Sequence, residues 1–180
     1  MSEQEDKRLI EEFLAGNEAA YNMLARKYRS RIYWHARRMV GNHEDADEVA
    51  QETLIAIYQK VKDFKALSSF STWVYKITSS RSLNIIRKRK VKNFVTLDFL
   101  KDKQNREDII KNFEDKEKLN EVEKKLMKLP DKQREVFVLR HFEELSYNEI
   151  SEITGQAIGT LKANYFHALK KIVKENGDEK

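Results

Sequence analysis

The chain has 180 residues, of which 36% are charged, and its 35 lysines and arginines against 30 acidic residues give a formal net charge of +5. This length allows one domain or two small ones, and the excess of positive charge suits a polyanionic partner. Because the chain has no cysteine, disulfide frameworks, thiolate zinc sites and cysteine nucleophiles are excluded.

The N-terminal sequence, MSEQEDKRLIEEF, lacks the basic segment and apolar run of a secretory signal. No stretch approaches the 18 consecutive apolar residues that indicate a transmembrane helix. We therefore expect a soluble, cytoplasmic protein. Five glycines and one proline in the whole chain favour long helices over β-hairpins, and predict an all-α fold.

The first forty residues show three apolar stripes at helical spacing. Leu9, Ile10 and Phe13 belong to the first stripe, which ends at Gly16, and Asn17 can cap the helix that follows. The third stripe ends at Gly41-Asn42. These stripes are interpreted as core faces, and no catalytic constellation appears among them.

The segment 42–61, NHEDADEVAQETLIAIYQKV, carries five acidic residues and no lysine or arginine between positions 42 and 52. Acidic residues in a first helical turn complement the helix dipole, so a solvated face is one interpretation. The other is a docking face for a basic protein surface. Contact with DNA is excluded, because phosphates would repel this patch.

Residues 64–92 combine four aromatic residues with a basic end. A serine-rich turn, LSSFST, leads into a helix that closes with five basic residues between Arg87 and Lys92. Aromatic rings beside cationic side chains are typical of single-strand binding, in which bases stack and cations follow the phosphates. A core role for the same rings is the alternative, and the sequence leaves both open.

From about residue 94 to 118 the apolar pattern loosens. Residues 98–123 carry nine acids and six bases, which predicts an acidic, flexible linker that competes with nucleic acid. Apolar periodicity resumes near Leu119, and Pro130 divides two helices.

The stretch from Ser146 to Lys171, SYNEISEITGQAIGTLKANYFHALKK, predicts two short helices around a turn. Ser146 and Glu149 have the spacing of a capping box, and Gly155 suits a left-handed turn position. The pattern indicates a DNA-binding helix-turn-helix, with an ordinary αα-hairpin as the alternative.

The order of these parts, with their sequences, resembles the extracytoplasmic-function (ECF) group of the bacterial sigma-70 family of RNA polymerase sigma factors. DADEVAQETLIAIYQKVKDF resembles region 2.2, FSTWVYKITSSRSLNIIRKRK resembles regions 2.3 and 2.4, and LPDKQREVFVLRHFEELSYNEISEITGQAIGTLKANYFHALKK resembles region 4. The resemblance implies an all-α fold with region 2 at 1–93, a linker at 94–118 that threads through the polymerase, and region 4 at 119–180.

The resemblance also implies roles for individual residues. Docking on the β′ coiled coil of core RNA polymerase would involve Asp47, Glu48, Gln51 and Glu52. Recognition of the −10 promoter element, with a flipped base held by the loop before the helix, would involve Phe64, Phe70, Ser71, Trp73, Lys76, Ser80, Asn84, Arg87 and Lys88. Recognition of the −35 element would involve Lys162, Ala163, Phe166, His167, Lys170 and Lys171.

Some positions depart from the family pattern. Ser80 stands where many members carry asparagine, and Gln156-Ala157 replaces a common Ile-Pro. Because the recognition helix has few basic residues before Lys170, we expect Arg140 to share in anchoring phosphates with Lys170 and Lys171.

The partners implied are core RNA polymerase through its β′ and β subunits, promoter DNA, and an anti-sigma factor that could hold the chain at the inner face of the membrane. No cofactor, metal or small-molecule substrate is expected. An operator-binding regulator is the second hypothesis, although it would need neither the acidic face nor the aromatic-basic helix. An enzyme is the third, and it is disfavoured because no histidine pairs with a carboxylate at metal-ligand spacing.

Overall fold

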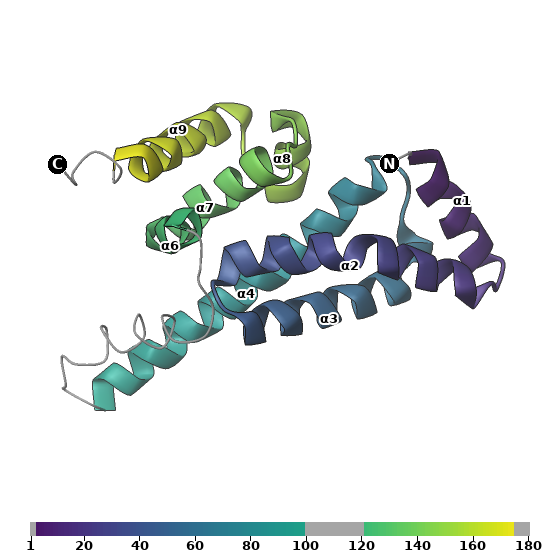
Figure 1. The fold of residues 1–180 in the computed structure, drawn as a ribbon, viewed down its shortest axis with the longest axis horizontal. Coiled ribbons are helices and arrows are strands. Elements are labelled where there is room, and N and C mark those ends of the chain that lie inside the picture. The colour runs from purple at the N-terminus through teal and green to yellow at the C-terminus, as the bar shows by residue number, and fades with distance from the viewer. Residues whose placement is uncertain (1–2, 100–120, 175–180) are drawn as a thin grey trace.

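The computed structural model describes residues 3–99 and 121–174, and all the regular structure in these ranges is helical. The elements are α1 (Glu3–Leu14), α2 (Glu18–Val40), α3 (His43–Lys60), the 3₁₀ turn η1 (Val61–Asp63), α4 (Phe70–Phe99), α6 (Glu121–Lys128), α7 (Asp131–Phe137), the π-helical turn η2 (Val138–Phe142), α8 (Tyr147–Thr154) and α9 (Ile158–Lys174). Helices α1–α4 form one group and α6–α9 a second group beside α2 and α4 (Figure 1). The predicted all-α fold with two helical domains is confirmed.

Side-chain caps fix the helix ends where the sequence predicted them. Asn17 Oδ1 accepts a hydrogen bond from the N–H of Ala19 at 3.1 Å, at the start of α2. Both bonds of the capping box join Ser146 and Glu149 at the start of α8. Gly155 ends α8 with φ +70°, in the left-handed region. The turn of the helix-turn-helix is thus set by local chemistry.

Three apolar clusters form the core, and two of them cross between the helical groups. The first lies within α1–α4 and includes Leu24 and Val74. The second brings Met39 and Ile86 together with Phe137. The third is the core of the helix-turn-helix around Ile150, and Tyr75 of α4 belongs to it. The two groups of helices therefore share buried surface.

Arg134 of α7 forms hydrogen bonds that link the two groups of helices. Its guanidinium donates to the carbonyl of Met39 at the end of α2, at 2.6 Å, and to three carbonyls at the end of α6, those of Leu126, Met127 and Leu129. Burial lowers the pKa of Arg134, and the nearby Asp131 carboxylate partly offsets this effect. One side chain thereby satisfies the carbonyls that two helices leave free at their C-terminal ends.

Helix α4 continues to Phe99, past the point at which the apolar pattern loosens. The first residues of the predicted linker at 94–118 are therefore helical. Residues 100–118 of the predicted linker lie outside the described residues, and so does most of the acidic stretch that we expect to compete with nucleic acid.

Gly41 joins α2 to α3 and lies against α6. Its φ is +89°, and a Cβ at this position would collide with the side chain of Met127. Gly16 has a similar φ of +97°, but nothing lies within 4 Å of a Cβ there. We expect Gly16→Ala to lower the free energy of unfolding by about 1 kcal/mol, the strain of a positive φ, and Gly41→Ala to lower it by more. Urea denaturation measures both, and equal losses would show that the Met127 contact has no effect.

Candidate nucleic-acid and protein interfaces

The acidic face of α3 points away from the core. Alanines, Val49 and Ile57 form the buried side of the helix, while Glu48 and Gln51 are exposed and Asp47 and Glu52 are half-buried. Gln51 Nε2 donates to Asp47 Oδ2 at 2.7 Å. Of the four predicted docking residues, Glu48 and Gln51 are therefore the most accessible to a partner.

Glu52 has an internal partner. Arg81 Nη1 of α4 donates to its carboxylate at 2.5 Å, which joins α3 to α4. A substitution of Glu52 would therefore remove an ion pair between α3 and α4 as well as change the charge of the exposed face.

The same face of α3 carries two large side chains that sequence reasoning missed. Ile55 is 57% exposed and Tyr58 is 44% exposed. Ile55 follows Glu48 by seven residues, two helical turns, so the two residues lie on one face. Ile55 thus adds apolar surface to the acidic face, although a single exposed apolar residue is common on protein surfaces and does not by itself indicate a partner. The helical periodicity of the sequence could have shown this exposure, because Ile55 lies outside the stripe of buried residues on α3.

Helix α4 presents a continuous polar face. Lys76, Ser80 and Asn84 recur every fourth residue and are exposed, and Arg87 and Lys88 extend this face. Arg87 Nη1 donates to Asn84 Oδ1 at 3.1 Å. The opposite side is buried and includes Val74, Thr78 and Ser82. All five predicted −10 residues of the helix body therefore share one accessible face.

The aromatic residues before and at the start of α4 divide between core and surface. Phe70 is only 3% exposed and packs edge-to-face on Tyr28. Phe64 and Trp73 are half-buried, with ring centroids 5.4 Å apart. The structure thus places Phe70 in the core, where it supports the loop, and leaves only Phe64 and Trp73 with accessible ring surface.

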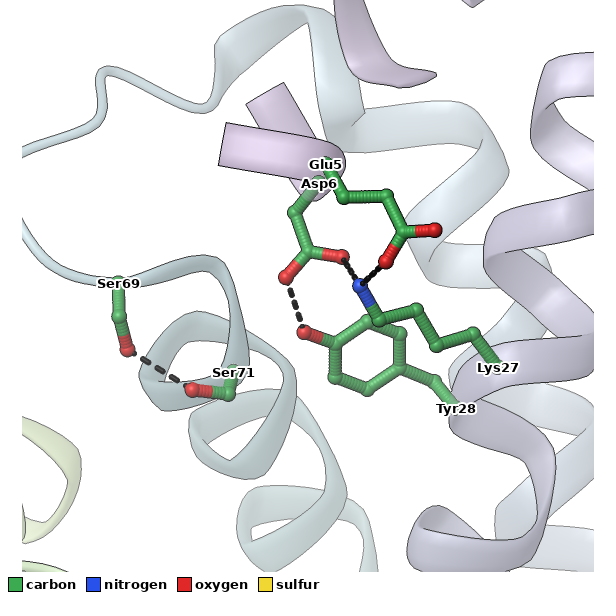
Figure 2. A network of polar contacts seen from close by, with 6 residues as sticks. All are labelled: Glu5, Asp6, Lys27, Tyr28, Ser69 and Ser71. Atoms are coloured by element: carbon green, nitrogen blue, oxygen red, sulfur yellow. Dashed lines mark hydrogen bonds and ion pairs between the residues drawn. The ribbon is translucent and has the colours of Figure 1, made fainter. Parts of the chain in front are cut away.

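A buried ionic network fixes α1 beside this loop. Asp6 accepts hydrogen bonds from Lys27 Nζ at 2.6 Å and from the Tyr28 hydroxyl at 2.7 Å, and Glu5 also accepts from Lys27 (Figure 2). Burial and the Asp6 carboxylate raise the pKa of Tyr28. On the neighbouring segment, Ser69 accepts from the N–H of Thr72 at 3.1 Å and so caps α4. The Ser69 cap thereby fixes the end of the loop at which α4 begins.

The second helix of the helix-turn-helix, α9, exposes its predicted reading face. Leu161 and Ala168 are buried, whereas Phe166 is 61% exposed. The predicted −35 residues are all exposed: Lys162, Ala163, Phe166, His167, Lys170 and Lys171. An exposed phenylalanine on a helix-turn-helix surface suits apolar contact with thymine methyl groups.

Gln156, which departs from the family pattern, has a structural partner on each of the two helices beside it. Gln156 Oε1 accepts from Asn164 Nδ2 at 3.1 Å, and the Gln156 carbonyl accepts from the Ser151 hydroxyl at 2.8 Å. Both contacts fix the turn between α8 and α9.

Arg140, which we expect to share in anchoring phosphates, also has internal partners. It donates to the carbonyl of Leu145 at 2.8 Å and lies over the ring of Tyr147. It is half-buried and helps to hold the loop before α8, and its contact with phosphates stays a prediction.

Among the described residues, no group of three histidine, cysteine or acidic side chains could hold a metal ion. No helix in that part of the chain is long and apolar enough to cross a membrane.

Comparison with known proteins matches both halves. The family model for sigma-70 region 2 matches residues 24–91, and the model for sigma-70 region 4 matches residues 119–172. The chain is 30% identical to the ECF RNA polymerase sigma factor SigW of Bacillus subtilis, over 96% of this chain and 97% of that protein. It is 28% identical to the RNA polymerase sigma-H factor of Pseudomonas aeruginosa, over 97% and 95% of the two chains.

Two solved structures share the fold. CnrH, in complex with the cytosolic domain of CnrY, superposes with a TM-score of 0.71 at 19% identity, covering 98% of this chain and 99% of that one. RpoE of Bartonella quintana, in complex with the anti-sigma factor NepR, superposes with a TM-score of 0.70 at 20% identity, covering 89% and 98%.

Proposed function

The chain belongs to the sigma-70 family and is an ECF RNA polymerase sigma factor, and from this premise we propose which of its surfaces meets each partner. The exposed face of α3 around Glu48 docks on core polymerase. The polar face of α4, with Phe64 and Trp73, engages the −10 element, and the exposed face of α9 engages the −35 element. The polymerase supplies the chemistry of RNA synthesis, and this chain supplies the choice of promoter.

One observation supports the assignment best. Three helices each bury an apolar side and expose a distinct surface, which is acidic with Ile55 on α3, basic and polar on α4, and aromatic with sparse charge on α9. An acidic face repels DNA, whereas the basic face of α4 attracts phosphates. The three surfaces therefore suit a protein partner, a nucleic-acid backbone and base edges, in that order along the chain.

The same proposal divides the chain into region 2 at 1–93, a linker at 94–118 and region 4 at 119–180. It also includes control by an anti-sigma factor, since the solved neighbours CnrH and RpoE are bound to CnrY and NepR. Such a partner would keep the chain in the cytoplasm and, where it is membrane-bound, at the inner face of the membrane.

Reconstituted run-off transcription tests this function. We expect the full chain with core polymerase to yield discrete transcripts from a subset of genomic fragments, while core polymerase alone yields none from them. The chain alone should bind duplex DNA weakly, because Lys162 is the only basic residue of α9 before Lys170. Tight binding to duplex DNA without polymerase, with no specific transcript, would instead indicate an operator-binding regulator.

A further inference from the structure

A buried carboxylate joins the two groups of helices, in addition to Arg134 and the two shared apolar clusters. Glu143 follows η2, just before the helix-turn-helix, and its side chain is only 8% exposed. The Tyr75 hydroxyl of α4 donates to its Oε2 at 2.5 Å. Its Oε1 lies 3.5 Å from Nδ1 of His35 and 3.8 Å from Nη1 of Arg38, both on α2. We call His35, Arg38 and Tyr75 the socket of Glu143.

The socket favours the ionised carboxylate. Burial alone would raise the pKa of Glu143, but contacts with His35, with Tyr75 and with the charge of Arg38 outweigh it and lower the pKa. Burial and the carboxylate together raise the pKa of Tyr75, so its hydroxyl keeps the proton that it donates. The interaction is therefore a charge-assisted one, and such bonds are roughly twice as strong as neutral ones.

The polar groups that hold Glu143 come from α2 and α4, whereas Glu143 itself lies between η2 and α8. The contact is therefore made between the two groups of helices and not within either of them, so it is lost when they separate.

Closure around Glu143 brings the helix-turn-helix onto α4. Helix α8 packs against α4, and Thr72 of α4 lies 3.5 Å from Glu149 of α8. Ile150 and Ile153 share an apolar cluster with Tyr75. The start of α4, next to the loop that we assign to the −10 element, is therefore covered by the half that we assign to the −35 element.

The closed arrangement is too short for a promoter. Elements named −10 and −35 lie about 25 base pairs apart, or about 85 Å at ~3.4 Å per pair. Helix α4 has 30 residues and spans about 45 Å at ~1.5 Å per residue. With α8 packed directly on α4, the two reading faces lie within roughly that length. Separation is possible, because residues 100–120 could reach at most about 70 Å if fully extended.

We propose that Glu143 is a releasable latch, which holds the free sigma factor closed by inserting into the socket of His35, Arg38 and Tyr75, and which must leave that socket before both promoter elements can be contacted. This inference rests on the proposed function for its biological meaning. The closure itself is a property of the free chain and is measured without polymerase.

The experiment uses Glu143→Gln, which keeps the shape of the side chain and removes its charge. Glu144→Gln is the matched control, because Glu144 is the next residue and is exposed. The chain has no cysteine, so spin labels can be placed on introduced cysteines at Asn22 of α2 and Glu152 of α8, both exposed. Pulsed electron paramagnetic resonance then gives the distance distribution between α2 and α8 in each full-length protein.

We expect one short distance in the parent and in Glu144→Gln, and at least a tenfold larger population of long distances in Glu143→Gln. Tyr75→Phe, which removes one donor, should give a smaller shift in the same direction. Circular dichroism must show the same helix content throughout, so that opening is distinguished from unfolding. An unchanged distance distribution in both socket variants, with the fold intact, would overturn the latch.

Core polymerase provides the second readout. If the open form alone binds, a tenfold larger open fraction should tighten the apparent Kd for core polymerase by up to tenfold. Opening in Glu143→Gln without polymerase binding by any variant would leave the latch standing and contradict the proposed function. The two failures are therefore distinguishable.

Discussion

Glu48→Lys is expected to weaken binding of the chain to core RNA polymerase by at least about a hundredfold, with the fold unchanged. Glu48 is exposed on the face of α3 opposite its buried side, so the substitution disturbs no internal contact. Close charge pairs across a protein interface contribute about 1.5–7 kcal/mol, and like charges placed together cost several kcal/mol. Charge reversal combines both effects, so the loss should exceed the ~2.7 kcal/mol that corresponds to a hundredfold change in Kd. Titration of fluorescently labelled core polymerase measures the loss.

The choice of residue decides how sharp this test is. Glu52→Lys would also break the ion pair with Arg81 between α3 and α4, so lost binding there could reflect altered packing. Glu11→Lys is the matched control, since Glu11 is an exposed acid on α1 and its substitution changes the net charge equally. Normal holoenzyme formation by Glu48→Lys, or an equal loss in Glu11→Lys, would contradict the docking assignment.

Local features of the fold were predictable from sequence because they depend on neighbouring residues. The capping box of Ser146 and Glu149 and the left-handed Gly155 act within one helical turn. The division of α3 into a buried and an exposed side follows from helical periodicity alone. The exposure of Ile55 followed from the same periodicity once the register of the helix was fixed.

Long-range features were not predictable in this way. Glu143 and His35 are brought together by packing across the two groups of helices, and no local pattern in the sequence marks either residue. The aromatic residues between 64 and 73 illustrate the same limit. In the sequence, a phenylalanine that fills the core cannot be distinguished from one that stacks on bases. Phe70 is recognised as internal only from its packing against Tyr28 in the structure.

Arg140 shows how an internal partner changes the interpretation of a charge. From sequence it was a cation near a sparsely basic recognition helix. In the structure its guanidinium donates to the Leu145 carbonyl and lies over Tyr147. One hydrogen bond uses only one of the five N–H donors of a guanidinium, so this contact restrains Arg140 while its contact with phosphates stays a prediction.

Phe166→Ala is expected to reduce −35-dependent initiation by about ten- to a hundredfold. The ring is 61% exposed, so its removal leaves the core around Leu161 intact. Burying an exposed phenylalanine side chain against an apolar surface contributes about 1.5–3 kcal/mol, which is the free-energy range of that loss. Abortive initiation by the holoenzyme on promoters with intact and scrambled −35 elements measures it as a ratio of rates, and the variant should bring this ratio close to one.

Two further variants separate base reading from other effects on α9. Val173→Ala is the matched control, because Val173 is also apolar, lies on α9 and is 58% exposed, but it lies two helical turns beyond Phe166, past Lys171, the last predicted −35 residue. It should leave the ratio of initiation rates unchanged. Lys162→Ala should weaken initiation on both promoters alike and reduce the salt dependence, as expected for a phosphate contact. If Phe166→Ala instead lowers both rates equally, its ring supports binding without reading sequence, and specificity at −35 must come from Ala163, His167 or the shape of the DNA.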